Sequence, residues 1–340
     1  MTDPLIKVGG EAAFSWRARG RGLGLTGLGP VALALALSAC ATAPRSDNAS
    51  LAKTGLQVTG TLAGDVNDLS KRLMQGDVQN AFSNTWDTCE SKPSLCEAKV
   101  PSGELSAARR KLATTISARA KAVSALNGAY GALAAEAAYD ARADASAAAR
   151  NAIDAAQTYA TLAGAGAVTP LVASVVTYGA GLWADRAQAR RLRDDNLKMA
   201  NAVNLLAKGL AKEKADFERI ADEIVQQEVE AHGALARSGL ASAGQALDPL
   251  TSGLGVTLVK DPDAVLTKSA SARAATQAVI LASANGKTAA LKARYSASLA
   301  ALDELKRQHL EATDDKPLDL SILNQRLSEL DGLLAQLKSN

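Results

Sequence analysis

Residues 199–231 read MANAVNLLAKGLAKEKADFERIADEIVQQEVEA. Steps of four and three through this stretch select a mostly apolar set, namely Met199, Val203, Leu206, Leu210, Glu213, Phe217, Ile220, Ile224, Gln227 and Ala231. This spacing places the set on one face of an α-helix and matches the heptad pattern of coiled coils. Glu213 and Gln227 interrupt the apolar face, and such polar positions either fix register or mark a solvent-exposed stretch. The sequence therefore predicts a long helix that packs through this face.

Three more stretches carry apolar residues at helical spacing. From Ser102 onward the stripe comprises Leu105, Leu112, Ile116, Val123, Leu126, Tyr130 and Leu133. Residues 262–312 carry Leu291, Tyr295, Ser298, Leu302 and Leu305, and the chain after Pro317 carries Leu320, Leu323, Leu327, Leu330, Leu334 and Leu337. Asp261 followed by Pro262 is typical of a helix start, whereas the glycine-rich residues 233–262 predict a loop. Long helices joined by short breaks indicate an all-α fold, an elongated antiparallel helical bundle with coiled-coil-like long helices.

The composition agrees with helices. The chain has 340 residues, of which 47% are hydrophobic but only 3% aromatic. Alanine is abundant, and alanine favours helix, whereas strands favour β-branched and aromatic residues. The formal charge is only +3, and no basic face with interleaved aromatics is visible, so nothing favours a nucleic-acid partner.

The first forty residues have the layout of an export signal. Arg17, Arg19 and Arg21 precede the charge-free run 22–39, which ends in Leu37, Ser38 and Ala39 before Cys40. The basic residues stay on the cytoplasmic side while the apolar run enters the bilayer, and small residues before the cysteine admit a peptidase. The run is shorter than the ~20 apolar residues of a stable span.

This stretch resembles the signal peptide and lipobox of bacterial lipoproteins. The resemblance implies cleavage after residue 39 and a covalent diacylglycerol and N-acyl lipid on Cys40. Ala41, which is not an aspartate, resembles the sorting signal for the periplasmic side of the outer membrane; the inner membrane and the cell surface stay open. Removal of residues 1–39 would leave 34 basic and 33 acidic side chains, a charge of +1.

The other two cysteines are predicted to pair with each other. Cys89 and Cys96 remain once Cys40 carries a lipid, and an exported chain meets an oxidising compartment. A metal pair or redox site is the alternative, but no histidine lies nearby and the spacing is not C-x-x-C. We thus expect a signal peptide at 1–39, a lipidated flexible tether at 40–64, a small helical region with the disulfide loop at 65–101, and the bundle at 102–340.

Residues 159–184 carry no charge and are as apolar as a membrane span. Three interpretations remain open: a transmembrane helix, a hydrophobic hairpin like the membrane-entering heads of pore-forming toxins, and a core segment covered by other helices or by a second copy. The residues that would contact a membrane or a partner are Val172, Val175, Val176, Tyr178, Leu182 and Trp183.

The sequence offers little catalytic chemistry. The two histidines, His232 and His309, are far apart, and we interpret both as solvated or capping residues on polar helix faces. No nucleophile motif, phosphate loop or zinc motif is found in the mature chain, so we expect no catalytic residue, no metal, no cofactor and no small-molecule substrate.

The leading hypothesis is a lipid-anchored periplasmic scaffold or protein-interaction lipoprotein, serving secretion, envelope assembly or immunity to a toxin. It would bind a protein partner or itself. The alternative is a membrane-active helical protein that inserts residues 159–184, and an enzyme ranks third.

Overall fold

The computed structural model describes residues 29–96, 107–138, 144–166, 169–171, 183–314 and 316–339. All regular elements within these ranges are helices, so the predicted all-α fold class is confirmed. The chain divides into two units, Met1–Thr42 and Ala43–Asn340. The second unit, which we call the body, contains the hydrophobic core.

The described residues form eight α-helices and two short 3₁₀ helices. In chain order they are α1 (Gly29–Ser91), the 3₁₀ turn η1 (Pro93–Leu95), α2 (Ala107–Ala137), α3 (Ala145–Leu162), α4 (Trp183–Arg237), η2 (Ala243–Leu247), α5 (Asp248–Leu254), α6 (Pro262–Lys268), α7 (Ala270–Thr313) and α8 (Ser321–Ser339). Asp261 caps α6 by accepting a hydrogen bond from the Ala264 amide at 3.0 Å, which confirms the predicted helix start.

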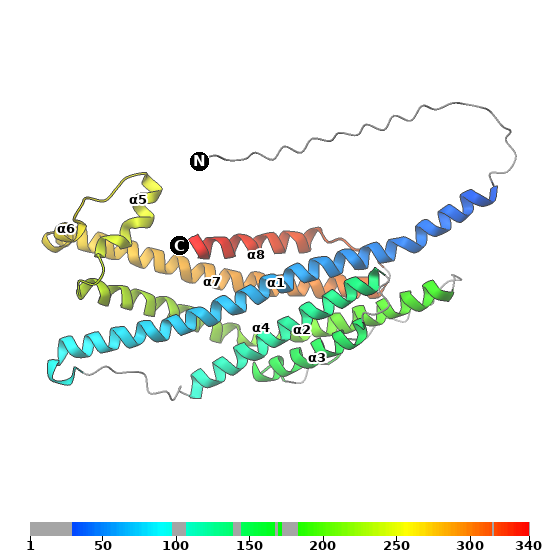
Figure 1. The fold of residues 1–340 in the computed structure, drawn as a ribbon, viewed down its shortest axis with the longest axis horizontal. Coiled ribbons are helices and arrows are strands. Elements are labelled where there is room, and N and C mark those ends of the chain that lie inside the picture. Colours follow the sequence, from blue (N-terminus) through cyan, green and yellow to red (C-terminus); the bar gives the residue numbers. More distant parts are fainter. Residues whose placement is uncertain are drawn as a thin grey trace, which may run out of the picture. The chain divides into compact units, whose positions relative to one another are not determined.

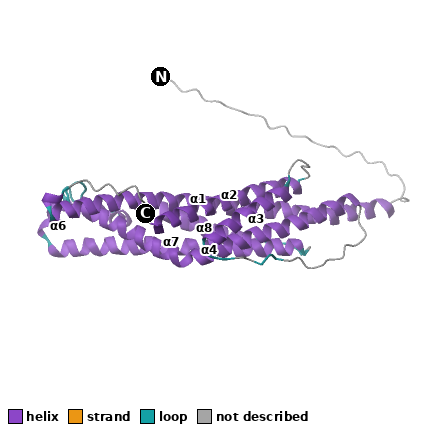
Figure 2. Ribbon diagram, turned by 90° about the horizontal axis from the view of Figure 1, so that it is seen from below, coloured by secondary structure: helices purple, strands orange, loops and turns teal. Residues whose placement is uncertain are grey.

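The long helices of the body lie side by side (Figures 1 and 2). Neighbours α1 and α2 run antiparallel, because Asn127 reaches the Leu56 carbonyl while Arg119, earlier on α2, reaches Asp65, later on α1. Helices α4 and α7 are also antiparallel, α3 packs on both α2 and α4, and α8 packs on α7. The predicted antiparallel bundle is therefore found in the body.

The stripes predicted from the sequence form the core. On α4 every member of the set from Met199 to Ala231 is buried except Gln227, which is half-buried. On α2 the stripe is buried from Ile116 to Leu133, whereas Leu112 is half-buried and Leu105 lies outside the described residues. The stripe of α7 is buried throughout, and Ser298 is fully buried and donates to the Arg294 carbonyl at 3.0 Å. On α8 only alternate members are buried, since this helix covers the outside of the bundle.

The prediction of a flexible tether at residues 40–64 is wrong for residues 48–64. Residues 48–64 belong to α1, and Leu51, Val58 and Leu62 are in the hydrophobic core. A buried polar side chain of this stretch has its hydrogen-bond partners inside the bundle. Thr59 donates to the Gly55 carbonyl at 2.8 Å and accepts from Asn127 at 2.7 Å, so its burial leaves no hydroxyl unsatisfied.

Four predicted segments also differ from the structure. Residues 65–91 are no separate small region but the second half of α1, so the bundle begins well before residue 102. The helix expected from Ser102 divides into α2 and α3, and the helix expected at 262–312 breaks at Ser269, which has an extended backbone and caps α7. Residues 233–262 contain the end of α4 as well as η2 and α5.

Candidate functional site

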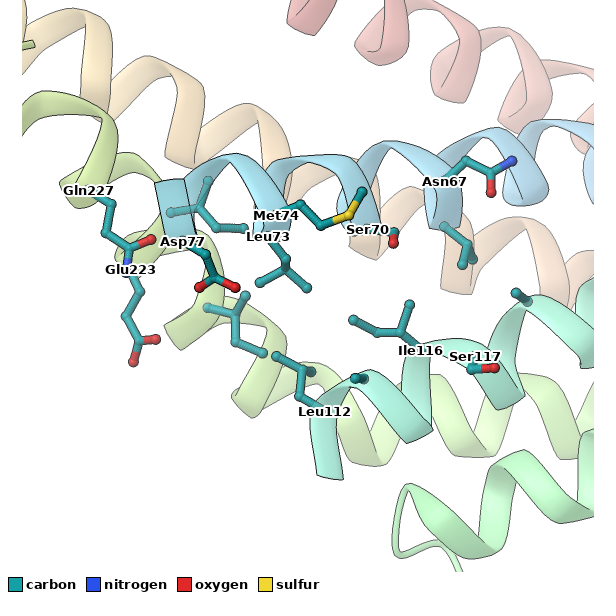
Figure 3. Close-up of a pocket in the computed structure, with 15 residues that line it drawn as sticks. Asn67, Ser70, Leu73, Met74, Asp77, Leu112, Ile116, Ser117, Glu223 and Gln227 are labelled. Atoms are coloured by element: carbon teal, nitrogen blue, oxygen red, sulfur yellow. The ribbon is translucent and has the colours of Figure 1, made fainter. Parts of the chain in front are cut away.

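An open groove lies between α1, α2 and α4 (Figure 3). Its volume is about 440 Å³. Each helix contributes one face, and the lining residues are Val66, Asn67, Ser70, Leu73, Met74, Asp77, Leu112, Ala113, Ile116, Ser117, Ala120, Ile220, Glu223, Ile224 and Gln227. We call it the α1–α2–α4 groove.

The groove is apolar with an acidic end. Met74 is 60% exposed, although it is a large hydrophobic side chain, and Leu73 and Leu112 beside it are only half-buried. Asp77 and Glu223 are the ionisable side chains among its lining residues, and Glu223 pairs with Arg219 on its own helix at 2.5 Å. Exposed apolar surface of this kind marks sites for proteins or apolar ligands.

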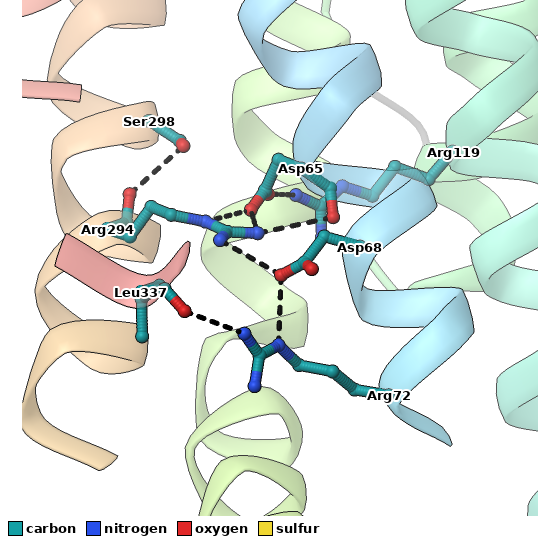
Figure 4. A network of polar contacts seen from close by, with 7 residues as sticks. All are labelled: Asp65, Asp68, Arg72, Arg119, Arg294, Ser298 and Leu337. Atoms are coloured by element: carbon teal, nitrogen blue, oxygen red, sulfur yellow. Dashed lines mark hydrogen bonds and ion pairs between the residues drawn. The ribbon is translucent and has the colours of Figure 1, made fainter. Parts of the chain in front are cut away.

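A network of charged side chains, most of them buried, joins α1 to α2 and α7 (Figure 4). Asp65, next to the groove residue Val66, accepts from Arg119 of α2 at 2.6 Å and from Arg294 of α7. Arg294 also reaches Asp68 at 3.1 Å, and Asp68 pairs with Arg72 at 3.0 Å. We call these five residues the Asp65 layer; it connects α1 with α2 and α7.

In the Asp65 layer, each buried arginine is paired with a carboxylate. Burial disfavours the Arg119 cation, but the nearby Asp65 carboxylate outweighs this and raises the pKa of Arg119. Arg119 also stands over the ring of Tyr295, 5.4 Å from its centroid, a cation–π arrangement. For Asp68, burial favours the neutral acid, yet the pairs with Arg72 and Arg294 prevail and lower its pKa. These shifts keep Arg119 and Asp68 charged at neutral pH.

A second buried pair extends this polar zone to α3 and α4. The Tyr159 hydroxyl donates to Glu213, and both side chains are buried. Burial raises the pKa of Tyr159, so its hydroxyl keeps its proton as a donor. Gly209 lies beside the ring of Tyr159, where any Cβ would collide with it. Glu213 thus proves to be a core residue that selects the position of α3 against α4.

A third cluster surrounds His309 on α7. Its Nε2 lies 2.7 Å from the Tyr130 hydroxyl, and its Nδ1 lies 2.8 Å from Oδ1 of Asn196. The Asn196 amide nitrogen donates to Asn48 at 2.5 Å and to the Leu192 carbonyl. Its oxygen therefore accepts from Nδ1, and Nε2 accepts from Tyr130. We call these four side chains the His309 cluster.

The structure corrects the interpretation of this histidine. His309 is fully buried, not solvated or capping, and burial lowers its pKa to about 3. Gly55 of α1 allows Tyr130 to reach it, because a Cβ at residue 55 would collide with the tyrosine ring. His232, in contrast, is partly exposed.

The cysteine prediction is confirmed: Cys89 and Cys96 form a disulfide with their Cα atoms 4.4 Å apart. It joins the end of α1 to the turn η1, away from the groove. Helix α1 includes the predicted lipobox residues Leu37, Ser38 and Ala39 and the predicted lipidation site Cys40. The structure does not test whether Cys40 carries a lipid.

The structure describes the apolar segment at residues 159–166, 169–171 and 183–184. Tyr159 lies in α3 and is buried, and Trp183 is the first residue of α4. Val172, Val175, Val176, Tyr178 and Leu182 lie outside the described residues. Across the described ranges, no helix is both long and apolar enough to span a bilayer.

Sequence reasoning missed the groove and the Asp65 layer. One signal was present: Arg119 stands three residues after Ile116 and four before Val123, so it occupies a position of the apolar stripe. Arg294 stands likewise between Leu291 and Ser298. A charge at a stripe position indicates either a break in the core or a buried partner, and the partner Asp65 is distant in sequence.

No group of histidine, cysteine and carboxylate side chains suited to hold a metal ion occurs in the described part of the chain. Comparison with known protein families, curated proteins and solved structures finds no match to this chain. The fold and the groove define it as an all-α helical bundle with an open apolar groove.

Proposed function

We propose that the chain is a lipid-anchored protein of the bacterial envelope whose helical body binds another protein. The observation that carries the proposal is the α1–α2–α4 groove, where Met74 is exposed between apolar walls from three helices. Large apolar side chains that line an open groove are typical of sites where another protein binds. The role would be that of a scaffold or accessory on the periplasmic side of the outer membrane.

The anchor in this proposal is Cys40. It follows Leu37, Ser38 and Ala39 and is the third cysteine, since the other two form the disulfide. The body begins at Ala43, three residues after Cys40, which is consistent with an anchor at this cysteine. Asn48 is already buried in the body, so residues 41–47 would be the whole connection between lipid and bundle. So short a connection would hold the bundle close to the membrane surface.

Replacing Cys40 by serine should abolish the anchor. We expect the wild-type protein to incorporate labelled palmitate and to sediment with the outer-membrane fraction, and the Cys40→Ser protein to do neither. Cys89→Ser is the matched control, because it removes a cysteine from the disulfide and should leave lipid labelling intact. Palmitate incorporation that persists in Cys40→Ser would contradict the anchor.

A further inference from the structure

We propose that the His309 cluster is an acid-sensitive latch. In mild acid, the end of the body that carries the cluster opens, while the Asp65 layer holds the rest of the bundle closed. We call this end the cluster end. The latch needs neither a lipid nor a partner, so it goes beyond the proposed function.

The cluster joins four helices where each of them has a terminus. Its four buried side chains come from α1, α2, α4 and α7. Helix ends open more readily than helix centres, because fewer contacts have to break. The cluster end can therefore open without unfolding of the whole bundle. The termini, all within about four helical turns of the cluster, are Ala43 at the start of the body, Ala137 of α2, Trp183 of α4 and Thr313 of α7.

The hydrogen bonds of the cluster fit only a neutral imidazole. Nε2 of His309 accepts from the Tyr130 hydroxyl, and Nδ1 donates to Asn196. A protonated imidazole donates at both nitrogens, so Tyr130 would have to accept, and its own proton would lose its acceptor. Burial raises the pKa of Tyr130, so this hydroxyl does not resolve the conflict by losing its proton. Protonation thus breaks the cluster and leaves a charge in the core.

The carboxylates that flank the cluster in the described ranges do not compensate a cation at His309. On α4, Asp195 pairs with Lys198 at 3.1 Å, and on α2, Glu136 pairs with Arg191 at 3.2 Å. Burial is accordingly the cause that lowers the pKa of His309 to about 3. The flanking carboxylates of the other packed segments are the partly exposed Asp47 of α1, Glu311 of α7 beside Arg307, and Asp319, which accepts from the Ser321 amide.

Acid favours the open cluster end because the open end binds a proton that the closed end does not bind. A hydrated histidine titrates near 6.5, whereas the closed cluster keeps His309 neutral. The equilibrium therefore shifts toward the open end as pH falls, by about 25-fold between pH 7 and pH 5. Opening exposes apolar side chains that are buried about one turn from the cluster, namely Leu51, Leu133 and Met199.

The Asp65 layer limits the opening. At about 1.5 Å per residue, Asp65 lies ~25 Å further along α1 than Asn48, and there it pairs with Arg119 of α2 and Arg294 of α7. Although burial opposes both charges, pairing leaves the pKa of Asp68 lowered and that of Arg119 raised. Both therefore stay charged at pH 5, and the three helices remain joined at this layer.

The test is hydrogen–deuterium exchange with mass spectrometry at pH 7 and pH 5. It uses the chain from residue 40 onward with Cys40→Ser, and protection is corrected for the pH dependence of exchange in unstructured peptides. Peptides from the cluster end, within 48–56, 126–134 and 302–313, should lose protection by about 25-fold at pH 5. Peptides around the Asp65 layer, within 65–76 and 287–296, should change by less than about threefold.

Three variants assign the effect to His309. His309→Gln should reduce the pH-dependent loss at the cluster end to less than about threefold, whereas the matched control His232→Gln should keep the full loss. Asn196→Asp places a carboxylate beside Nδ1, which stabilises the protonated imidazole, and it should also remove most of the pH dependence. This variant decides the matter if His309→Gln does not fold, and helical circular dichroism at pH 7 shows which variants fold.

A loss of protection that is equal along the whole bundle would overturn the latch, because the effect of acid would then be global unfolding. A loss at the cluster end that persists in His309→Gln or Asn196→Asp would also overturn it, since other groups would then take up the proton. Unchanged protection at the cluster end at pH 5 would have the same consequence.

Discussion

Replacing Asp65 by alanine is expected to lower the free energy of unfolding of the body by about 3 to 5 kcal/mol. Asp65 is the carboxylate to which both Arg119 and Arg294 donate, and these two guanidinium groups are almost fully buried. Removing one partner from a buried ion pair leaves charge in the core without compensation, which costs more than the pair itself contributes. Urea unfolding followed by far-ultraviolet circular dichroism measures the change.

Asp68→Ala is the matched control for this prediction. It removes the same charge from the same helix, but the Asp68 side chain is 32% exposed and Arg72 beside it is reached by water. The expected loss is about 1 kcal/mol, as for partly exposed pairs. Equal losses in the two variants would contradict the view that burial of the Asp65 layer determines the effect.

The second large effect is a loss of stability in mild acid. The folded state holds His309 neutral, with a pKa of about 3 caused by burial, whereas an unfolded histidine titrates near 6.5. Below pH 6.5 the unfolded chain therefore binds a proton that the folded chain does not bind. Stability is fully present above the unfolded pKa and falls as pH falls, by about 1.4 kcal/mol per pH unit. Between pH 6.5 and pH 5 the expected loss is about 2 kcal/mol.

Urea unfolding at several pH values between 7 and 5 tests this effect. His309→Gln should be less stable at pH 7, because Tyr130 and Asn196 lose a fitted partner, but its stability should no longer depend on pH in this range. His232→Gln, which changes the other, partly exposed histidine, should keep the wild-type slope. A wild-type slope in His309→Gln would show that other groups take up the proton.

The part of the fold that the sequence predicts is the part carried by apolar periodicity. The stripes of α2, α4 and α7 were visible because each repeats at steps of three and four over several turns. The disulfide was predictable from the number of cysteines and from the oxidising compartment that an export signal implies. Both signals can be read from the sequence without knowing which helices pack against each other.

Long-range polar pairing was not predictable. The polar residues up to Asn48 suggest a tether, yet Asn48 is buried against Asn196, and Thr59 further along α1 is buried against Asn127. His309 looked solvated for the same reason. A single sequence shows that a polar residue stands at a helix position but not which distant side chain satisfies it.

The groove was hidden for a different reason. It arises where the first turns of α2, around Leu112, meet the second half of α1 and the middle of α4. Its existence depends on the relative register of three helices, and helix boundaries are the least certain part of a sequence-based prediction.

The central claim is that the α1–α2–α4 groove is covered by a protein partner in the envelope. Photocrosslinking in the native host tests it directly, with a photoreactive amino acid in place of Ser117 inside the groove or Val78 outside it. We predict a discrete adduct with another protein from position 117, lost when Met74→Lys is added, and no such adduct from position 78. Equal adducts from both positions, or an adduct that Met74→Lys leaves unchanged, would contradict the claim.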